Sequence, residues 1–290
     1  MSGDMLGGRE AGGRYLDCAG RRLSLERTRV MGVLNITPDS FSDGGRFARG
    51  ATSLADVLTA AEGMIAGGAA ILDVGGESTR PGAPAVSVAE ELDRVLPVLE
   101  RLVALDTIVS IDTRKAEVAA AALAAGCHMI NDVSGLSNPA MLDVVAASQA
   151  AVCIMHMQGS PETMQRDPRY ADVVTEVRGE LAARVSRARA AGMTDNRLCI
   201  DPGFGFGKTL AHNLALFIGL ESLRVDGLPI LVGVSRKRMI GDLTGAPVER
   251  RQAGSVAAAV LAAERGADLV RVHDVAETVD ALKVLEAVRA

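Results

Sequence analysis

Basic side chains and one amide follow apolar runs of this 290-residue chain and point to an anionic ligand. They lie at the ends of the first, second, seventh and eighth runs or shortly after them: Asn35, Arg80, Lys237, Arg271 and His273. Guanidinium and ammonium groups near the start of a helix suit a phosphate or pyrophosphate, because they donate charge-assisted hydrogen bonds to its oxygens. We therefore expect an anion site where these residues meet.

Three other apolar runs end with two carboxylates and a second amide, Asp112, Asp201 and Asn131. Oxygen acceptors that face inward suit a ligand rich in N–H donors, such as the edge of an aminopyrimidinone. Taken singly, each residue is equally well explained as a helix cap or as a partner for backbone groups at a strand end. Their shared position at one end of successive elements favours a single pocket, with a neutral heterocycle inside and an anion near the rim.

The elements that must position these residues alternate along the chain. Apolar runs rich in Val and Ile predict eight strands: Val30–Ile36, Ala70–Gly75, Ile108–Asp112, Met129–Asp132, Ala151–His156, Leu198–Asp201, Ile230–Ser235 and Leu269–His273. Segments of helical period lie between and after them: Leu54–Ala66, Val88–Leu102, Lys115–Ala125, Pro139–Ala147, Val173–Ala190, Leu210–Leu220, Arg250–Arg265 and Val275–Val288. The strands are continuously apolar, which is typical of parallel strands covered on both faces.

Eight strand–helix units without a break in composition predict one α/β domain, a (β/α)8 TIM barrel over residues 14–290. A doubly wound sheet is the alternative, but it rarely needs eight units. Tyr15 to Leu25 predicts a short N-terminal hairpin that turns near Gly20 and plugs the N-terminal end of the barrel. We expect residues 1–13, which are rich in glycine, to be a disordered extension.

Composition excludes several classes of partner. Lys and Arg number 31 against 36 Asp and Glu, a net charge of −5 without a basic stripe, which argues against nucleic acid and anionic membranes. No apolar stretch is long enough for a membrane span. The four cysteines form no C-x-x-C pair, and three lie among apolar residues, as expected of buried thiols in a reducing compartment. The sequence thus predicts a cytoplasmic protein.

Two other patterns in the sequence do not predict a binding site, the first for a phosphate and the second for a metal. The segment Gly203–Thr209 is similar to a P-loop, but Pro202 stands where the first glycine of G-x-x-x-x-G-K-[ST] belongs, so a glycine-rich turn is the better interpretation. His128, His156 and His212 lack the spacing of metal ligands.

Eight sequence blocks together resemble the bacterial dihydropteroate synthases, in the order of that family. They are Met31–Gly45, Asp73–Gly82, Ser110–Thr113, Ile130–Gly135, Met155–Gly159, Asp201–Lys208, Ser235–Lys237 and Arg271–His273. The resemblance covers roughly residues 29–290, and eight blocks in register are far more specific than one motif.

The resemblance implies an enzyme of folate synthesis, a transferase and sulfonamide target that acts as a homodimer. Such enzymes condense 6-hydroxymethyl-7,8-dihydropterin pyrophosphate with 4-aminobenzoate, using Mg2+, and release 7,8-dihydropteroate and pyrophosphate. It also implies residue roles, with Asp112, Asp201, Lys237 and Arg271 as the catalytic set. The pterin would be held by Asp112, Asn131, Asp201 and Lys237, with Met155 and Phe206 lining its pocket. The pyrophosphate would meet Thr79, Arg80, Arg271 and His273, and Asn35 would bind Mg2+ with it. The aminobenzoate site would be shaped by Phe41, Pro81 and Ser235.

Chemically, loss of pyrophosphate from the CH2 group leaves a cation that is delocalised into the pterin ring, which is the dissociative route suggested for the family. The arylamine is already neutral at pH 7, so no strong general base is needed. One departure is Arg238, where many relatives have a serine that meets the aminobenzoate carboxylate.

Two other interpretations share the scaffold. A corrinoid-dependent methyl-tetrahydrofolate methyltransferase would not need the pyrophosphate cluster of Arg80, Lys237 and Arg271. A non-catalytic pterin-binding homologue would be expected to have degraded loops, whereas the loop sequences here are complete.

Overall fold

The computed structural model describes residues 13–36, 53–78, 85–160 and 163–289. Within these residues eight parallel strands form one sheet, in the order β8-β7-β6-β5-β4-β3-β10-β9. Their bounds are β3 Arg29–Asn35, β4 Ile71–Gly75, β5 Ile108–Asp112, β6 Met129–Asp132, β7 Ala151–Met155, β8 Leu198–Asp201, β9 Leu231–Val232 and β10 Leu269–Val272. A parallel bridge between Ile200 and Ile230 joins the two edges of the sheet, so the strands close into the expected barrel.

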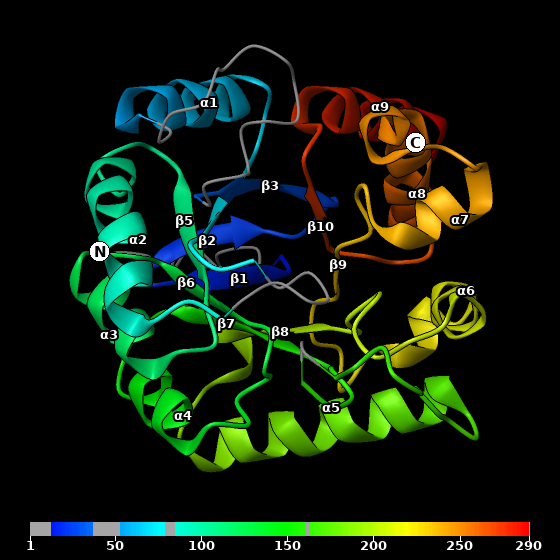
Figure 1. The fold of residues 1–290 in the computed structure, drawn as a ribbon, viewed down its shortest axis with the longest axis horizontal. Coiled ribbons are helices and arrows are strands. Elements are labelled where there is room, and N and C mark those ends of the chain that lie inside the picture. The colour runs from blue at the N-terminus through cyan, green and yellow to red at the C-terminus, as the bar shows by residue number, and fades with distance from the viewer. Residues whose placement is uncertain (1–12, 37–52, 79–84, 161–162, 290) are drawn as a thin grey trace, which may run out of the picture.

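Helices surround the sheet, one after another in chain order (Figure 1). Their bounds are α1 Leu54–Ala66, α2 Val88–Leu102, α3 Ala116–Ala124, α4 Pro139–Ala146, α5 Val173–Ala190, α6 Leu210–Ile218, α7 Arg238–Thr244, α8 Gln252–Glu264 and α9 Val275–Arg289. The described residues also form three short 3-10 helices between these elements: Asp195–Arg197, Leu220–Leu223 and Val248–Arg250. None of the described helices is both long and apolar enough to cross a bilayer.

Local sequence explains where several helices begin. Ser53, Ser87 and Thr209 each accept a hydrogen bond from the backbone N–H three residues later, and so satisfy a group that the first turn leaves free. The predicted units are confirmed with small shifts of bounds, but the expected strand Ile230–Ser235 is wrong in length. Only Leu231–Val232 is a strand, because a tight turn at 234–237 leads directly into α7. The predicted helices did not include a segment for α7.

The hairpin closes the N-terminal end of the barrel, as predicted. Strands β1 (Tyr15–Cys18) and β2 (Arg21–Ser24) pair antiparallel and turn at Ala19 and Gly20, both at positive φ. Their buried side chains pack on the first residues of the barrel strands in one apolar cluster that includes Leu16, Leu23, Met31, Ile71, Ile108, Met129, Ala151, Leu231 and Leu269. The chemistry must therefore lie at the opposite end.

Removing a buried side chain from the hairpin should destabilise the whole barrel. Leu16 is fully buried in this cluster, and we expect Leu16→Ala to lower the free energy of unfolding by about 3 kcal/mol, through lost burial plus a cavity. Urea denaturation measures the change, with Val288→Ala as the control because Val288 is 80% exposed. A loss below about 1 kcal/mol would mean that the hairpin packs too loosely to seal the barrel.

Candidate active site

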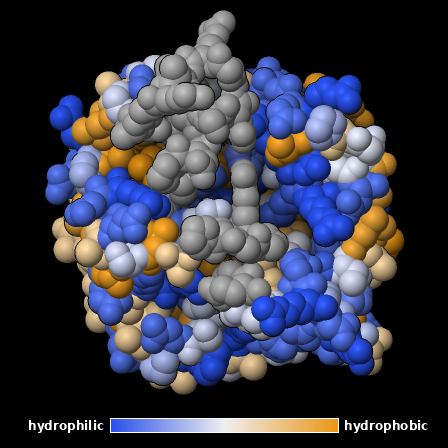
Figure 2. All heavy atoms as spheres, viewed as in Figure 1, coloured by the Kyte–Doolittle hydropathy of each residue, from blue (hydrophilic) through white to orange (hydrophobic). Residues whose placement is uncertain are grey.

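Polar side chains from six strands meet at the C-terminal end of the barrel. Asp73 and Asp112 come from β4 and β5, and the remaining contributors follow from neighbouring strands: Asn35 (β3), Asn131 (β6), Asp201 (β8) and Arg271 (β10). Figure 2 shows hydrophilic residues flanking the centre of the face viewed in Figure 1. Parallel strands in a barrel all end at one face, so residues far apart in the sequence converge there.

A buried chain of ion pairs lies at the centre of this site. Arg271 donates from Nε to Asp73 Oδ2 at 2.6 Å and from an Nη atom to Asp112 Oδ2 at 2.8 Å. The Nδ2 atom of Asn131 donates to the same Asp73 oxygen at 2.9 Å. Thus Asp73, which is fully buried, orients both Arg271 and Asn131.

The charges of this chain depend on one another. Burial raises the pKa of Asp112 to about 7, against the opposing effect of Arg271, and nearby Asp73 adds to the rise. Burial alone would lower the pKa of Arg271, but Asp73 and Asp112 outweigh it and raise that pKa. The free oxygens Asp73 Oδ1 and Asp112 Oδ1 are buried without a protein partner in the described part of the chain. Such acceptors are costly unless a ligand meets them.

Asp201 and Lys237 form the second half of the pocket. Asp201 is buried at the end of β8, where its Oδ1 accepts from the N–H of Gly203 at 2.7 Å. Burial raises the pKa of Asp201, and Lys237 opposes that rise. Burial lowers the pKa of Lys237 to about 8, although Asp201 counteracts it. The Asp201 carboxylate and the Lys237 ammonium therefore have little contact with water, and a polar ligand that binds both groups would be favoured.

The segment after β8 completes this wall. Lys237 Nζ donates to the carbonyl of Phe204 at 2.7 Å and lies 4.8 Å from the centre of the Phe206 ring. Lys208 is buried beneath, where its Nζ donates to the carbonyls of Gly203 and Phe206 at 2.9 Å each. The ammonium of Lys208 thus fixes the loop that carries Phe206. Met155 belongs to the same small apolar cluster as Phe206.

The rim is formed by the ends of β3, β9 and β10. Ser235 Oγ lies 3.0 Å from His273 Nδ1 and accepts from the His273 N–H at 3.2 Å. A Cβ atom placed on Gly75 would lie 3.4 Å from Asn35 Oδ1 and 3.7 Å from Asp112 Cβ. The absence of a side chain at Gly75 therefore leaves the Asn35 amide open beside Asp112.

Phe206 lies against Lys237 at this end of the barrel. The structure also brings nine other predicted site residues there: Asn35, Asp112, Asn131, Met155, Asp201, Ser235, Lys237, Arg271 and His273. Phe41, Thr79, Arg80 and Pro81 lie outside the described residues. Arg271, predicted with the basic set, also pairs with Asp73 and Asp112. It lies close to Lys237 as well, since a Cβ atom on Gly233 would contact both side chains, so the two predicted sets meet at Arg271. Sequence reasoning did not single out Asp73 or Lys208 as site residues.

The oxygen donors suit a magnesium ion only together with an anionic ligand. Mg2+ commonly keeps waters and takes one or two protein oxygens plus substrate phosphates. Asn35 Oδ1 is such an oxygen, and Asp112 Oδ1 is a buried acceptor nearby. No group of three or more His, Cys, Asp and Glu residues in the described segments could hold a metal by itself. The donor set therefore fits a cation that is shared with a phosphate group.

Comparisons with known proteins find relatives over nearly the whole chain. Residues 31–273 match the family described as pterin binding enzyme. The dihydropteroate synthase of Escherichia coli K12 is 49% identical over 269 residues, which are 92% of this chain and 94% of that protein. A structure of Xanthomonas albilineans dihydropteroate synthase with 4-aminobenzoic acid is 53% identical, with a TM-score of 0.89, over 96% of this chain and 99% of the other. That of Burkholderia cenocepacia, complexed with 7,8-dihydropteroate, is 50% identical with a TM-score of 0.87 and covers 96% and 97% of the two chains.

Proposed function

The chain belongs to the dihydropteroate synthase family of pterin-binding enzymes, and we propose that its barrel mouth performs that condensation. The pterin pyrophosphate would lose pyrophosphate, and the amine of 4-aminobenzoate would take its place on the CH2 group to give 7,8-dihydropteroate. The observation that carries this is the buried chain Asp73–Arg271–Asp112 beside Asp201 and Lys237. It offers paired acceptors and cations at the depth where a heterocycle would sit.

We propose that the pterin ring lies among Asp112, Asn131, Asp201 and Lys237. The amino group and ring N–H groups of a pterin are donors, and carboxylate oxygens accept them in paired fashion. The free Oδ1 of Asp112 supports this assignment, because it has no protein partner among the described residues. Phe206 and Met155 would cover the ring faces.

The same carboxylates would assist departure of the leaving group. As the C–O bond to pyrophosphate breaks, positive charge spreads into the ring, and Asp112 and Asp201 lie in a poorly solvated pocket where fixed charges act strongly. Electrons of the C–O bond leave with pyrophosphate, and the arylamine lone pair then forms the C–N bond. The proton lost from nitrogen passes to solvent or to the pyrophosphate, so no dedicated base is required.

Polar side chains at the rim would receive the leaving group. We assign His273, which directly follows β10, to the pyrophosphate side by family resemblance. Thr79 and Arg80 are assigned there by family resemblance. Asn35 would hold Mg2+ together with the pyrophosphate, and the metal when bound would neutralise charge on the phosphate oxygens. Exclusion of water matters here, since water would otherwise capture the ring cation.

The aminobenzoate would lie outside the pterin, near Ser235, with Phe41 and Pro81 assigned by resemblance. The side chain of Arg238 is 90% exposed and pairs with Asp242 at 3.4 Å, so it is free to turn toward a carboxylate at the rim. We propose that it binds that carboxylate in place of serine. Arg238→Ala should then raise the KM for aminobenzoate about 5- to 10-fold, with the KM for the pterin substrate unchanged, as expected for one exposed charge-assisted hydrogen bond. Unchanged aminobenzoate binding in this variant would assign the contact to backbone amides instead.

The rate should show a bell-shaped pH dependence. The acid limb comes from Asp112, whose pKa is raised to about 7, because protonation removes the anion that faces the ring. The alkaline limb comes from Lys237, whose pKa is lowered to about 8, because deprotonation removes its charge. A profile of kcat/KM for the pterin substrate reports groups of the free enzyme. Asp112→Asn should abolish the acid limb; a limb that stays near pH 7 in this variant would assign it to another group.

The reaction is tested by pyrophosphate release with both substrates present. We expect release to require 4-aminobenzoate and to be accompanied by 7,8-dihydropteroate. Release that is independent of the amine, or an activity that requires a corrinoid, would contradict the proposal. Pterin binding without any turnover would indicate the non-catalytic homologue.

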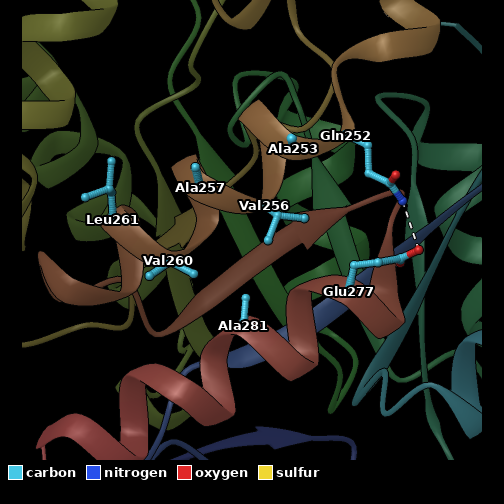
Figure 3. Close-up of a pocket in the computed structure, with 8 residues that line it drawn as sticks. All are labelled: Gln252, Ala253, Val256, Ala257, Val260, Leu261, Glu277 and Ala281. Atoms are coloured by element: carbon cyan, nitrogen blue, oxygen red, sulfur yellow. Dashed lines mark hydrogen bonds between the residues drawn. The ribbon is translucent and has the colours of Figure 1, made fainter.

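We also propose a homodimer, which rests on family resemblance and on an apolar groove on the outer wall of the barrel. The groove lies between α8 and α9, away from the mouth, and it is lined by Val256, Val260, Leu261 and Ala281, with Gln252 and Glu277 hydrogen-bonded at one end (Figure 3). Leu261 is 44% exposed. Such a face favours burial against a second copy. Sedimentation of the parent and of Leu261→Glu should show a dimer and a monomer, respectively.

A further inference from the structure

A strained turn carries two of the proposed site residues. The chain from β9 to α7 turns at 234–237, where the N–H of Lys237 bonds to the carbonyl of Val234 at 3.2 Å. Arg236, the third residue of the turn, has φ +56, in the left-handed region that favours glycine or asparagine at this position. A long side chain in that conformation persists only where its surroundings impose it, and such residues cluster at functional sites.

The side chain of Arg236 is held by the segment after β10. Its Nη2 and Nε atoms lie 2.7 and 3.3 Å from the two carboxylate oxygens of Asp274, so the guanidinium grips the carboxylate with both donors. Asp274 is buried and directly follows His273. The pair thus ties the β9–α7 turn to the end of β10.

The backbone of Arg236 is held by the first turns of α8. Its N–H donates to Ser255 Oγ at 2.8 Å, and its carbonyl accepts from Arg251 at 3.1 Å. The guanidinium of Arg251 also lies against Gly241 of α7, where a Cβ atom would come within 2.3 Å of it. The conformation of Arg236 is therefore fixed from three sides.

The two neighbours of Arg236 point into the site. Ser235 lies against His273, and Lys237 lies over Phe206 and against the Phe204 carbonyl. If the turn relaxed to negative φ at Arg236, the direction of the chain between these neighbours would change. One strained residue thus sets the relative position of a pterin contact and a rim contact.

We propose that Arg236 and Asp274 are a positioning pair, whose bidentate contact imposes the strained turn that aims Ser235 and Lys237 into the site. Neither residue is assigned a contact with substrate. The inference rests on the proposed function, since it treats Ser235 and Lys237 as substrate contacts.

A double-mutant cycle tests the pair. Arg236→Ala and Asp274→Ala should each lower kcat/KM for the pterin substrate about 30-fold, because a small misplacement of reacting groups is costly. The double variant should be no more than about twofold worse than the poorer single variant, since both changes break one contact. Arg189→Ala, which removes surface ion pairs with Asp195 and Asp226, is the control and should match the parent in kcat/KM.

A second variant separates positioning from folding. Glycine tolerates positive φ, so Arg236→Gly should regain the thermal stability that Arg236→Ala loses, while its calorimetric affinity for a pterin without pyrophosphate stays weak. Recovery of both stability and affinity in Arg236→Gly would overturn the proposal, as would full additivity in the cycle or single variants within threefold of the parent. A parent enzyme that binds pterin but releases no pyrophosphate would instead contradict the proposed function, and the affinity arm would still test the pair.

Discussion

Arg271→Ala is expected to lower kcat/KM for the pterin substrate by about 10³-fold, because it removes a preorganised cation and leaves two buried carboxylates without their partner. Of its two donors among the described residues, Asp73 would keep only Asn131, and protonation of Asp112 would become more favourable. Steady-state pyrophosphate release gives the rate. Arg169→Ala is the matched control, since Arg169 is 84% exposed and pairs only with Asp167 among the contacts described. A loss of less than about 10-fold would place Arg271 outside the catalytic machinery.

The same variant should also lose stability in a pH-dependent way. Without the guanidinium, burial raises the pKa of Asp112 further above its value in the unfolded chain. The folded state then binds more protons than the unfolded state, so stability falls as the pH rises through that window and returns as the pH falls. Thermal unfolding of Arg271→Ala should therefore approach that of the parent on going from pH 8 to pH 6. A deficit that is equal at both pH values would point to lost packing rather than to unpaired charge.

Asp201→Asn is expected to weaken pterin binding by about 10²-fold, although the side chain keeps its shape. An amide offers one acceptor oxygen and one NH2 group, so it meets a donor edge with further donors, and Lys237 loses the charge that faces it. Calorimetry with a pterin that lacks pyrophosphate isolates this effect from turnover.

Asp132→Asn provides the comparison for Asp201→Asn. Asp132 is also a buried carboxylate at a strand end, but both of its oxygens are used by the turn that follows β6, where they accept from Ser134 and Leu136. This variant should lose stability and keep its pterin affinity. Equal losses of affinity in the two variants would mean that Asp201 acts through the fold and not through direct contact.

The sequence was sufficient for the barrel and for residues at strand ends. Asp112, Asn131 and Asp201 each end an apolar run, and closure of parallel strands brings such residues to one face whatever their spacing in the chain. The N-terminal plug was predictable for a similar reason. An apolar hairpin that precedes the first strand lies next to the N-terminal ends of the barrel strands, whose apolar side chains it can cover.

Asp73 was missed because it lies inside β4 and not at its end. A carboxylate in the middle of a fully buried strand needs a partner, and this was a signal that the sequence offered. Its partner Arg271 is 198 residues away, so the pairing depends on which side chains the closed barrel turns inward. Lys208 and Arg236 were missed for another reason. Lys208 binds backbone carbonyls and Arg236 has a left-handed φ, and neither property can be predicted from the pattern of residue types.

The apolar plug closes the lower end of the barrel. The substrates would therefore enter, and the products would leave, through the mouth at the other end. The acceptors Asp73 and Asp201 lie inside, whereas Arg238 lies on the exposed edge. With the amine bound at the rim as proposed, an arylamine that arrived first would stand in the path of the larger heterocycle. We therefore expect an order of addition in which the pterin precedes the amine.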